Sequence, residues 1–215
     1  MTAPGDDCLL YLITPPVIDA DGFARTLADA LGAGPVGAVQ LRLKDTDDDA
    51  IRRAARVLLP VCHDHGVLLI MNDRPDLAAE TGCDGVHVGQ SDTSYADARK
   101  IMGTAKVVGV TCHASRHLAM EAGEAGAEYV AFGAFFPTDT KTVEHHADPD
   151  IVQWWHEMTV VPQVVIGGIT VDNCRPLVAA GADFLAVVSG AWNYPGGPAE
   201  AVRAFNWVIA ETPRP

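Results

Sequence analysis

Residues 36–65 read VGAVQLRLKDTDDDAIRRAARVLLPVCHDH, and this stretch holds one complete strand-and-helix unit. The apolar run Val36–Leu41 is typical of a parallel strand that is covered on both faces. Apolar residues recur at helical spacing through Asp47–His65, which predicts an amphipathic helix. A strand followed by such a helix is the repeating unit of α/β folds.

The same unit recurs along the rest of the chain. Eight apolar runs have the length and composition of strands: Leu9–Thr14, Val36–Leu41, Val67–Met71, Gly85–Val88, Lys106–Val110, Tyr129–Gly133, Gln163–Ile166 and Phe184–Val188. Helical patterns follow nearly every run, such as Ser115–Gly126 and Pro198–Ile209, and Thr170–Asn173 offers helix-capping oxygens before another. Eight units at roughly regular spacing predict an α/β fold, a single-domain (β/α)₈ TIM barrel over residues 1–215. An open doubly wound sheet is the structural alternative, but it would usually have fewer strands and a glycine-rich turn after the first.

Charge and composition exclude several classes of partner. The formal net charge is −13, and a surface this negative repels the phosphate backbone of nucleic acids. No apolar run approaches the roughly 20 residues of a membrane-spanning helix, and the acidic N-terminus lacks the basic start of a signal peptide. The five cysteines are widely spaced, which favours reduced thiols over a disulfide framework. We therefore expect a cytoplasmic protein with no nucleic-acid or membrane partner, whose oligomeric state is left open, a homo-oligomer included.

Polar side chains gather where the predicted strands end, which is where barrel enzymes carry their catalytic groups. After the second strand, Gln40, Arg42 and Lys44 project to the same side of an extended chain. A pair of cations beside an amide suits a pyrophosphate. A solvated strand end with mixed charges is the simpler alternative for this segment alone.

Two aspartates follow the third and fourth strands, Asp73 and Asp92. These strand ends are adjacent in a barrel, so the two carboxylates are expected to hold Mg²⁺ together with pyrophosphate oxygens. For Asp92 alone, capping of the helix that follows is the competing explanation.

The stretch 136–148 after the sixth strand is long enough for a lid loop. Lys141 lies on it, with the hydroxyls of Thr138 and Thr140. The lid is therefore expected to bring one more cation to the mouth of the barrel.

Glycines follow the seventh strand in Ile166–Ile169 and the eighth strand in Val187–Gly190. Glycine turns expose backbone N–H groups, and the helix starts beside them favour an anion. With the cations after the second strand, the residues predict two anion-binding regions. That layout suits two phosphorylated groups or one diphosphorylated ligand.

Seven stretches together resemble the thiamine-phosphate synthase family, and they follow one another from the second strand to the eighth. They are Gln40–Asp45, Met71–Arg74, Asp84–Asp92, Gly109–His113, Gly133–Lys141, Ile166–Ile169 and Val187–Ser189. Each motif is short, but their order and their placement at successive strand ends are highly specific. The resemblance covers nearly the whole chain. It implies a transferase of thiamine biosynthesis that joins hydroxymethylpyrimidine pyrophosphate to thiazole phosphate and releases pyrophosphate.

The resemblance also implies roles for particular residues. The pyrophosphate would be held by Arg42, Lys44, Asn72, Thr111 and Lys141, and Mg²⁺ by Asp73 and Asp92. The aminopyrimidine would be bordered by Gln40 and His87, and the thiazole phosphate bound by Thr138, Thr140, Gly168, Val188 and Ser189. Arg42, Lys44, Thr111 and Lys141 are the expected catalytic residues. The implied reaction is a substitution at the pyrimidine methylene, so the demand on the protein is electrostatic and positional.

Leu43 stands where the family usually has an acidic residue, which leaves open what supports its two basic neighbours. Cys112 is expected to pack rather than to act as a nucleophile, because strand alternation points it away from Thr111 and His113. The sister group, thiazole tautomerase, is the closest alternative, with His113 as its acid–base catalyst. It would leave the pyrophosphate and Mg²⁺ residues unexplained. A non-catalytic paralogue that binds thiamine-precursor phosphates is a third interpretation, against which the two metal carboxylates argue.

Overall fold

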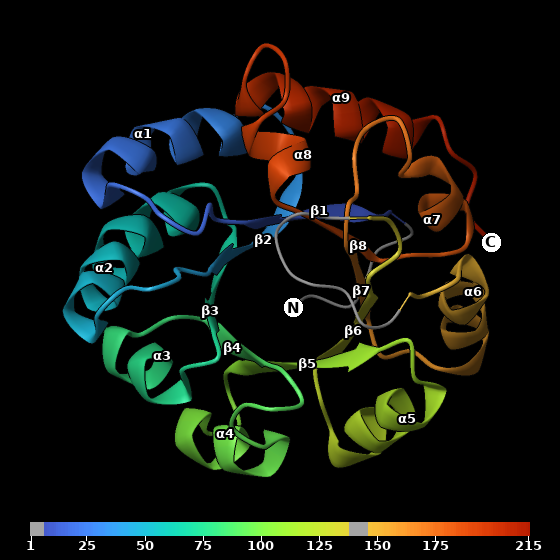
Figure 1. Ribbon diagram of the computed structural model, residues 1–215, viewed down its shortest axis with the longest axis horizontal. Helices are drawn as coiled ribbons and strands as arrows, with labels where there is room; N and C mark the ends of the chain where they lie inside the picture. Colours follow the sequence, from blue (N-terminus) through green and yellow to red (C-terminus); the bar gives the residue numbers. More distant parts are fainter. Residues whose placement is uncertain (1–6, 138–145) are drawn as a thin grey trace.

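Eight parallel strands close into a barrel in which each strand pairs with its neighbour in sequence and β8 pairs with β1 (Figure 1). The computed structural model describes residues 7–137 and 146–215. The strands are β1 (Leu9–Ile13), β2 (Val36–Leu41), β3 (Leu68–Asn72), β4 (Gly85–Val88), β5 (Val107–His113), β6 (Tyr129–Gly133), β7 (Gln163–Ile166) and β8 (Phe184–Val187). The (β/α)₈ barrel expected from the sequence is confirmed, and the open-sheet alternative is excluded.

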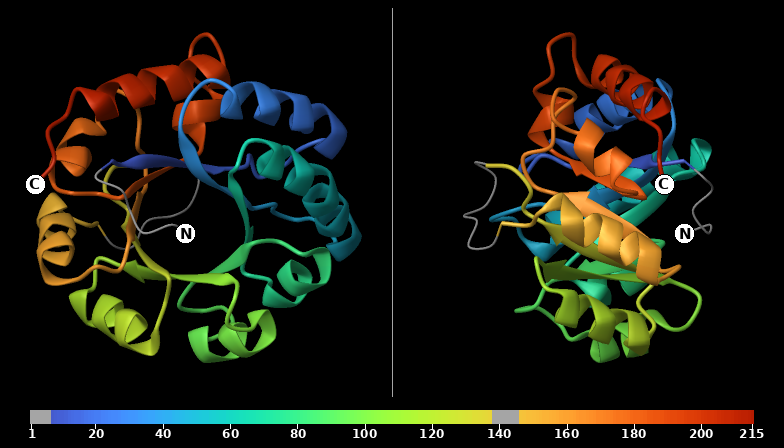
Figure 2. Two further views of the ribbon diagram at one scale, coloured as in Figure 1. Left: turned by 180° about the vertical axis from the view of Figure 1, so that it is seen from behind. Right: turned by 90° about the vertical axis from the view of Figure 1, so that its right-hand side faces the viewer.

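Helices alternate with the strands and form a ring outside them, which Figure 2 shows from behind and from the side. They are α1 (Ala20–Leu31), α2 (Asp48–Asp64), α3 (Pro75–Thr81), α4 (Tyr95–Met102), α5 (Arg116–Ala125), α6 (Pro149–Met158), α7 (Arg175–Ala179), α8 (Ser189–Trp192) and α9 (Pro198–Ala210). In the described part of the chain, no helix is long and apolar enough to cross a membrane. The helix predicted over Asp47–His65 is α2, with Asp47 as its N-cap and His65 as its C-cap.

The buried side chains form two layers. The larger lies between the strands and the helices, and it holds alternate strand residues such as Leu10, Leu12 and Val39. The smaller fills the inside of the barrel and includes Tyr11 and Tyr129. Successive side chains of a strand point to opposite faces, so each strand contributes to both layers.

The structure differs from the sequence prediction in two places that bear on the site. The fifth strand runs on to His113 instead of ending at Val110, with a register shift against β6 between Thr111 and His113. A bulge of this kind re-aims side chains at the rim of a barrel. The oxygens of Thr170–Asn173 do not cap the next helix, since α7 has Cys174 as its N-cap without a side-chain hydrogen bond.

Candidate active site

A continuous chain of hydrogen-bonded side chains crosses the inside of the barrel. The Gln40 amide Nε2 donates to the Tyr11 hydroxyl at 3.1 Å, and that hydroxyl lies 3.0 Å from the Tyr129 hydroxyl. His87 joins the next two groups, with Nδ1 2.8 Å from the Tyr129 hydroxyl and Nε2 2.7 Å from the Thr111 hydroxyl. The structure thus brings three predicted site residues together through two tyrosines that sequence reasoning did not select.

Tyr129 occupies space that only a glycine leaves open. Its ring stacks on the His87 ring, with the centroids 5.5 Å apart and the planes 15° from parallel. A Cβ on Gly109, on the neighbouring strand, would fall among the atoms of the Tyr129 ring. Burial raises the pKa of both Tyr129 and Tyr11 well above the usual value, so both keep their hydroxyl protons at neutral pH. The network therefore presents protonated tyrosine hydroxyls, with the His87 ring beside them, to the barrel interior.

The tyrosines could have been found from strand alternation. Each is the polar aromatic residue at an inward position of an otherwise apolar strand, LLYLI for β1 and YVAFG for β6. A buried tyrosine hydroxyl usually has a hydrogen-bond partner. That signal identifies a buried polar network but not its other members.

Asp73 and Asp92 lie within hydrogen-bonding reach of each other at the ends of β3 and β4. The pKa of Asp73 is raised to about 6, first by burial and then by the negative charge of Asp92. Asn72 opposes this effect, because its Nδ2 donates to the Asp73 carboxylate at 2.5 Å. Asp92 accepts a hydrogen bond from the Gly89 N–H at 3.0 Å. Asp92 does not cap the helix that follows it, because the N-cap of α4 is Ser94. Helix capping is therefore not the role of Asp92.

This carboxylate pair fits a magnesium ion that substrate oxygens help to hold. Within residues 7–137 and 146–215, no three His, Cys, Asp or Glu side chains gather as a self-sufficient metal site. Mg²⁺ usually takes only one or two protein carboxylates, with phosphate oxygens and waters completing its shell. A cation between Asp73 and Asp92 would also relieve the repulsion that raises the pKa of Asp73.

Arg42 lies close to this pair, since its positive charge lowers the pKa of Asp73. The buried Thr14 hydroxyl accepts from the Arg42 N–H at 3.0 Å and donates to the Arg42 carbonyl at 3.3 Å. One residue on, the Lys44 N–H donates to the Pro16 carbonyl at 2.9 Å. The end of β1 thus supports both basic residues, and Leu43 packs against the outer core. No acidic residue is needed at position 43 for this support.

The glycine turn after β7 lies against the chain that follows β6. Gly167 and Gly168 have φ of 110° and 63°, a region that side chains disfavour. A Cβ on Gly168 would collide with the Pro137 carbonyl, so this approach of two loops also requires glycine. Val188 is the N-cap of the short helix α8, which begins at Ser189. The predicted phosphate residues Gly168, Val188 and Ser189 all lie at the carboxyl ends of β7 and β8.

Three predicted residues, Thr138, Thr140 and Lys141, lie outside the described residues, as does most of the proposed lid. Their roles stay predictions. His113 lies at the end of β5 with φ of 52°, half-buried. Cys112 is buried in the outer core, and burial raises the pKa of its thiol to about 12, as expected for a packing residue and not for a nucleophile.

Comparison with known proteins shows the family to which this chain belongs. The family model for thiamine monophosphate synthase matches residues 10–191, nearly the whole barrel. The chain belongs to the thiamine-phosphate synthase family. A thiamine-phosphate synthase of Rhodospirillum centenum is 63% identical over 203 residues, which cover 94% of this chain and 98% of that protein. One of Hyphomonas neptunium is 46% identical, with 92% and 91% covered.

A solved structure supports the same family assignment. The thiamine phosphate pyrophosphorylase from Pyrococcus furiosus superposes with a TM-score of 0.81 at 26% identity, covering 96% of this chain and 97% of that one. The resemblance inferred from the strand-end motifs is confirmed.

Proposed function

We propose that this protein is a thiamine-phosphate synthase, which couples hydroxymethylpyrimidine pyrophosphate with thiazole phosphate to give thiamine phosphate and pyrophosphate. The observation that carries the proposal is the match to a protein of that name at 63% identity over almost the full length of both chains. The comparisons bear out the transferase activity expected from the sequence. Its magnesium dependence and the roles of its residues are part of the proposal.

The leaving group of the proposed reaction is a pyrophosphate, and the cations and hydrogen-bonding side chains near Asp73 could bind such an anion. Arg42 and Lys44 follow β2, and Arg42 lies close to the carboxylate pair. Asn72 ends β3, and Thr111 lies near the end of β5. With Lys141, these cations and polar groups would bind the pyrophosphate and stabilise the charge it gains as the carbon–oxygen bond breaks. Asp73 and Asp92 would hold Mg²⁺. When bound, the ion supplies Lewis-acid stabilisation of phosphate oxygens.

The second half of the reaction joins the thiazole nitrogen to the pyrimidine methylene carbon. Gln40 and His87, fixed by the tyrosine network, would border the aminopyrimidine and hold its orientation. The thiazole phosphate would lie against Gly168, Val188 and Ser189, with Thr138 and Thr140 from the loop. In this arrangement the two substrates would lie side by side at the carboxyl end of the barrel. The reaction needs no protein nucleophile, consistent with the buried Cys112.

Thiazole tautomerase activity is the alternative, with His113 as its acid–base catalyst. His113 does lie at the mouth of the barrel, at the end of β5. A tautomerase has no use for the carboxylate pair or for the cations beside it. The pair of Asp73 and Asp92 therefore favours the synthase.

A two-substrate assay tests the proposal. The purified protein is expected to form thiamine phosphate and pyrophosphate in equal amounts, and only when both precursors are present. His113→Ala should keep this coupling, since His113 has no part in it. Conversion of the thiazole phosphate to a tautomer without consumption of the pyrimidine, abolished by His113→Ala, would contradict the proposal and establish the tautomerase.

A further inference from the structure

Asn173 lies five residues beyond Gly168, the second glycine of the turn after β7, and uses both ends of its side-chain amide on the segment that follows the turn. Its Nδ2 donates to the Gly168 carbonyl at 2.9 Å, and its Oδ1 accepts from the Thr170 N–H at 2.8 Å. The side chain therefore bridges the segment between the last glycine and the next threonine. The sequence predicted helix capping for this segment, and the structure uses the Asn173 side chain on the turn instead.

Two carbonyls of the turn are fixed in direction by hydrogen bonds. The Gly167 carbonyl accepts from the Phe136 N–H at 3.0 Å, and the Gly168 carbonyl accepts from Asn173. The peptide bonds that follow these carbonyls are trans, since the cis bond in the described chain is at Gly133–Ala134. In a trans peptide the N–H points away from the carbonyl. Holding the Gly167 and Gly168 carbonyls therefore aims the N–H groups of Gly168 and Ile169 the opposite way.

The two glycines themselves restrict the backbone of the turn very little. Gly167 and Gly168 both have positive φ, and glycine is the residue with the widest choice of backbone conformations. The Phe136 N–H restrains only the first of the two peptide planes. The second plane is restrained by the amide of Asn173, which α7 does not use as a cap.

We propose that Asn173 is a positioning residue that aims the Gly168 and Ile169 N–H groups at the phosphate of the thiazole substrate. The inference rests on the proposed function and adds a residue to it. Asn173 acts on the phosphate through the backbone and contacts neither the reacting carbon nor the pyrophosphate. Its effect is therefore specific to one substrate and to one group of that substrate.

Asn173→Ala tests this through its separate effects on the two substrates. The KM for thiazole phosphate should rise about tenfold, the loss expected when an aligned hydrogen bond to a charged group is removed. The KM for the pyrimidine pyrophosphate should stay within about twofold. With the thiazole alcohol, which lacks the phosphate, kcat/KM should equal that of the wild type. Asn206→Ala is the matched control, because the Asn206 amide on α9 likewise makes two hydrogen bonds to the backbone, donating to the carbonyls of Pro35 and Val202.

The outcomes separate this inference from the proposed function. If the wild type makes no thiamine phosphate, the proposed function fails and this inference fails with it. If the wild type is active and Asn173→Ala raises both KM values equally, lowers kcat with the alcohol or changes nothing, only the inference is overturned. Should Asn173→Ala not fold, Asn173→Ser replaces it. A serine hydroxyl can still accept from the Thr170 N–H but is too short to reach the Gly168 carbonyl.

Discussion

Asp73 combines a left-handed backbone, with φ of 61°, and a carboxyl group that is partly buried beside Asp92. The pKa of Asp73 is about 6, above the ordinary value of 3.8, so its ionised form is disfavoured in the folded protein. The destabilisation is present above about pH 6 and disappears below about pH 4, where the group is neutral in both states. The partly buried Asp73 carboxylate beside Asp92 thus reduces the stability of the folded protein at neutral pH.

We expect Asp73→Asn to unfold a few degrees higher than the wild type at pH 7.5 without Mg²⁺, and at the same temperature at pH 4. Asparagine tolerates positive φ, so the backbone should not be strained. Calorimetry at both pH values measures the difference. Asp76→Asn is the control, because Arg74 lowers the pKa of Asp76 and the opposite sign is expected there. A lower unfolding temperature for Asp73→Asn at pH 7.5 would contradict the repulsion between the carboxylates.

Strand β5 shows at the level of one element how the barrel interior is fitted to the site. Gly109 leaves room for the ring of Tyr129 on β6, and Thr111 on the same face of β5 meets His87. Beyond Thr111 the register shift turns the strand end. The position of His87 therefore depends on a small residue of its neighbouring strand.

We predict that Gly109→Ala lowers the free energy of unfolding by about 1–3 kcal/mol, the usual loss for overpacking. Turnover should fall too, since displacement of Tyr129 removes the partner of His87 Nδ1. Chemical denaturation of Gly109→Ala, of Tyr129→Ala and of the double variant gives a double-mutant cycle, which measures the interaction between the two positions. The double variant should be more stable than the sum of the two losses implies. If the two losses of unfolding free energy simply add, the methyl group introduced at position 109 does not contact Tyr129.

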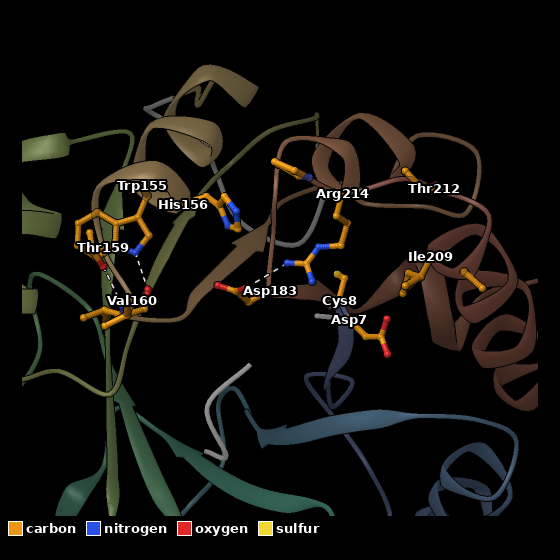
Figure 3. A pocket seen from close by; sticks show the side chains of 13 residues that line it. Asp7, Cys8, Trp155, His156, Thr159, Val160, Asp183, Ile209, Thr212 and Arg214 are labelled. Atoms are coloured by element: carbon orange, nitrogen blue, oxygen red, sulfur yellow. Dashed lines mark hydrogen bonds and ion pairs between the residues drawn. The ribbon is translucent and has the colours of Figure 1, made fainter. Parts of the chain in front are cut away.

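At the scale of the whole molecule, the two ends of the barrel have different tasks. A cavity of about 680 Å³ lies at the amino-terminal end, opposite the candidate site, and is lined by Arg214, Asp183 and Trp155 among others (Figure 3). Arg214 reaches across to Asp183, and its Nη2 also donates to the carbonyls of Gly181 and Ala182. These contacts hold the Arg214 guanidinium against the start of β8. This end therefore secures the C-terminal segment to β8.

Arg214→Met should lower the free energy of unfolding by about 3 kcal/mol, because it leaves the Asp183 carboxylate buried without its cation. Unfolding in denaturant measures the loss. Both KM values should be those of the wild type, since residues at this end of a barrel serve stability. A changed KM with unchanged stability would instead connect this cavity to the reaction.

The sequence was sufficient for the order of the elements, because each strand is a short apolar run and each helix an amphipathic one. It also placed Asp73, Asp92 and Arg42 at neighbouring strand ends, since topology alone brings them together. The sequence could not predict contacts that depend on the exact register of neighbouring strands or on the exact path of the backbone. The bulge before His113, the fit of Tyr129 over Gly109 and the use of Asn173 on its own turn all arise from backbone positions that composition does not encode.

The central claim is that the carboxyl end of this barrel joins two phosphorylated precursors with the help of a magnesium ion at Asp73 and Asp92. The most direct test is thiamine phosphate formation by the wild type and Asp92→Ala across a titration of Mg²⁺ into metal-free protein. We predict product from the wild type only when Mg²⁺ is present, and loss of most turnover in Asp92→Ala that added Mg²⁺ does not restore. Equal turnover with and without the metal, or near-normal rates in Asp92→Ala, would contradict the account.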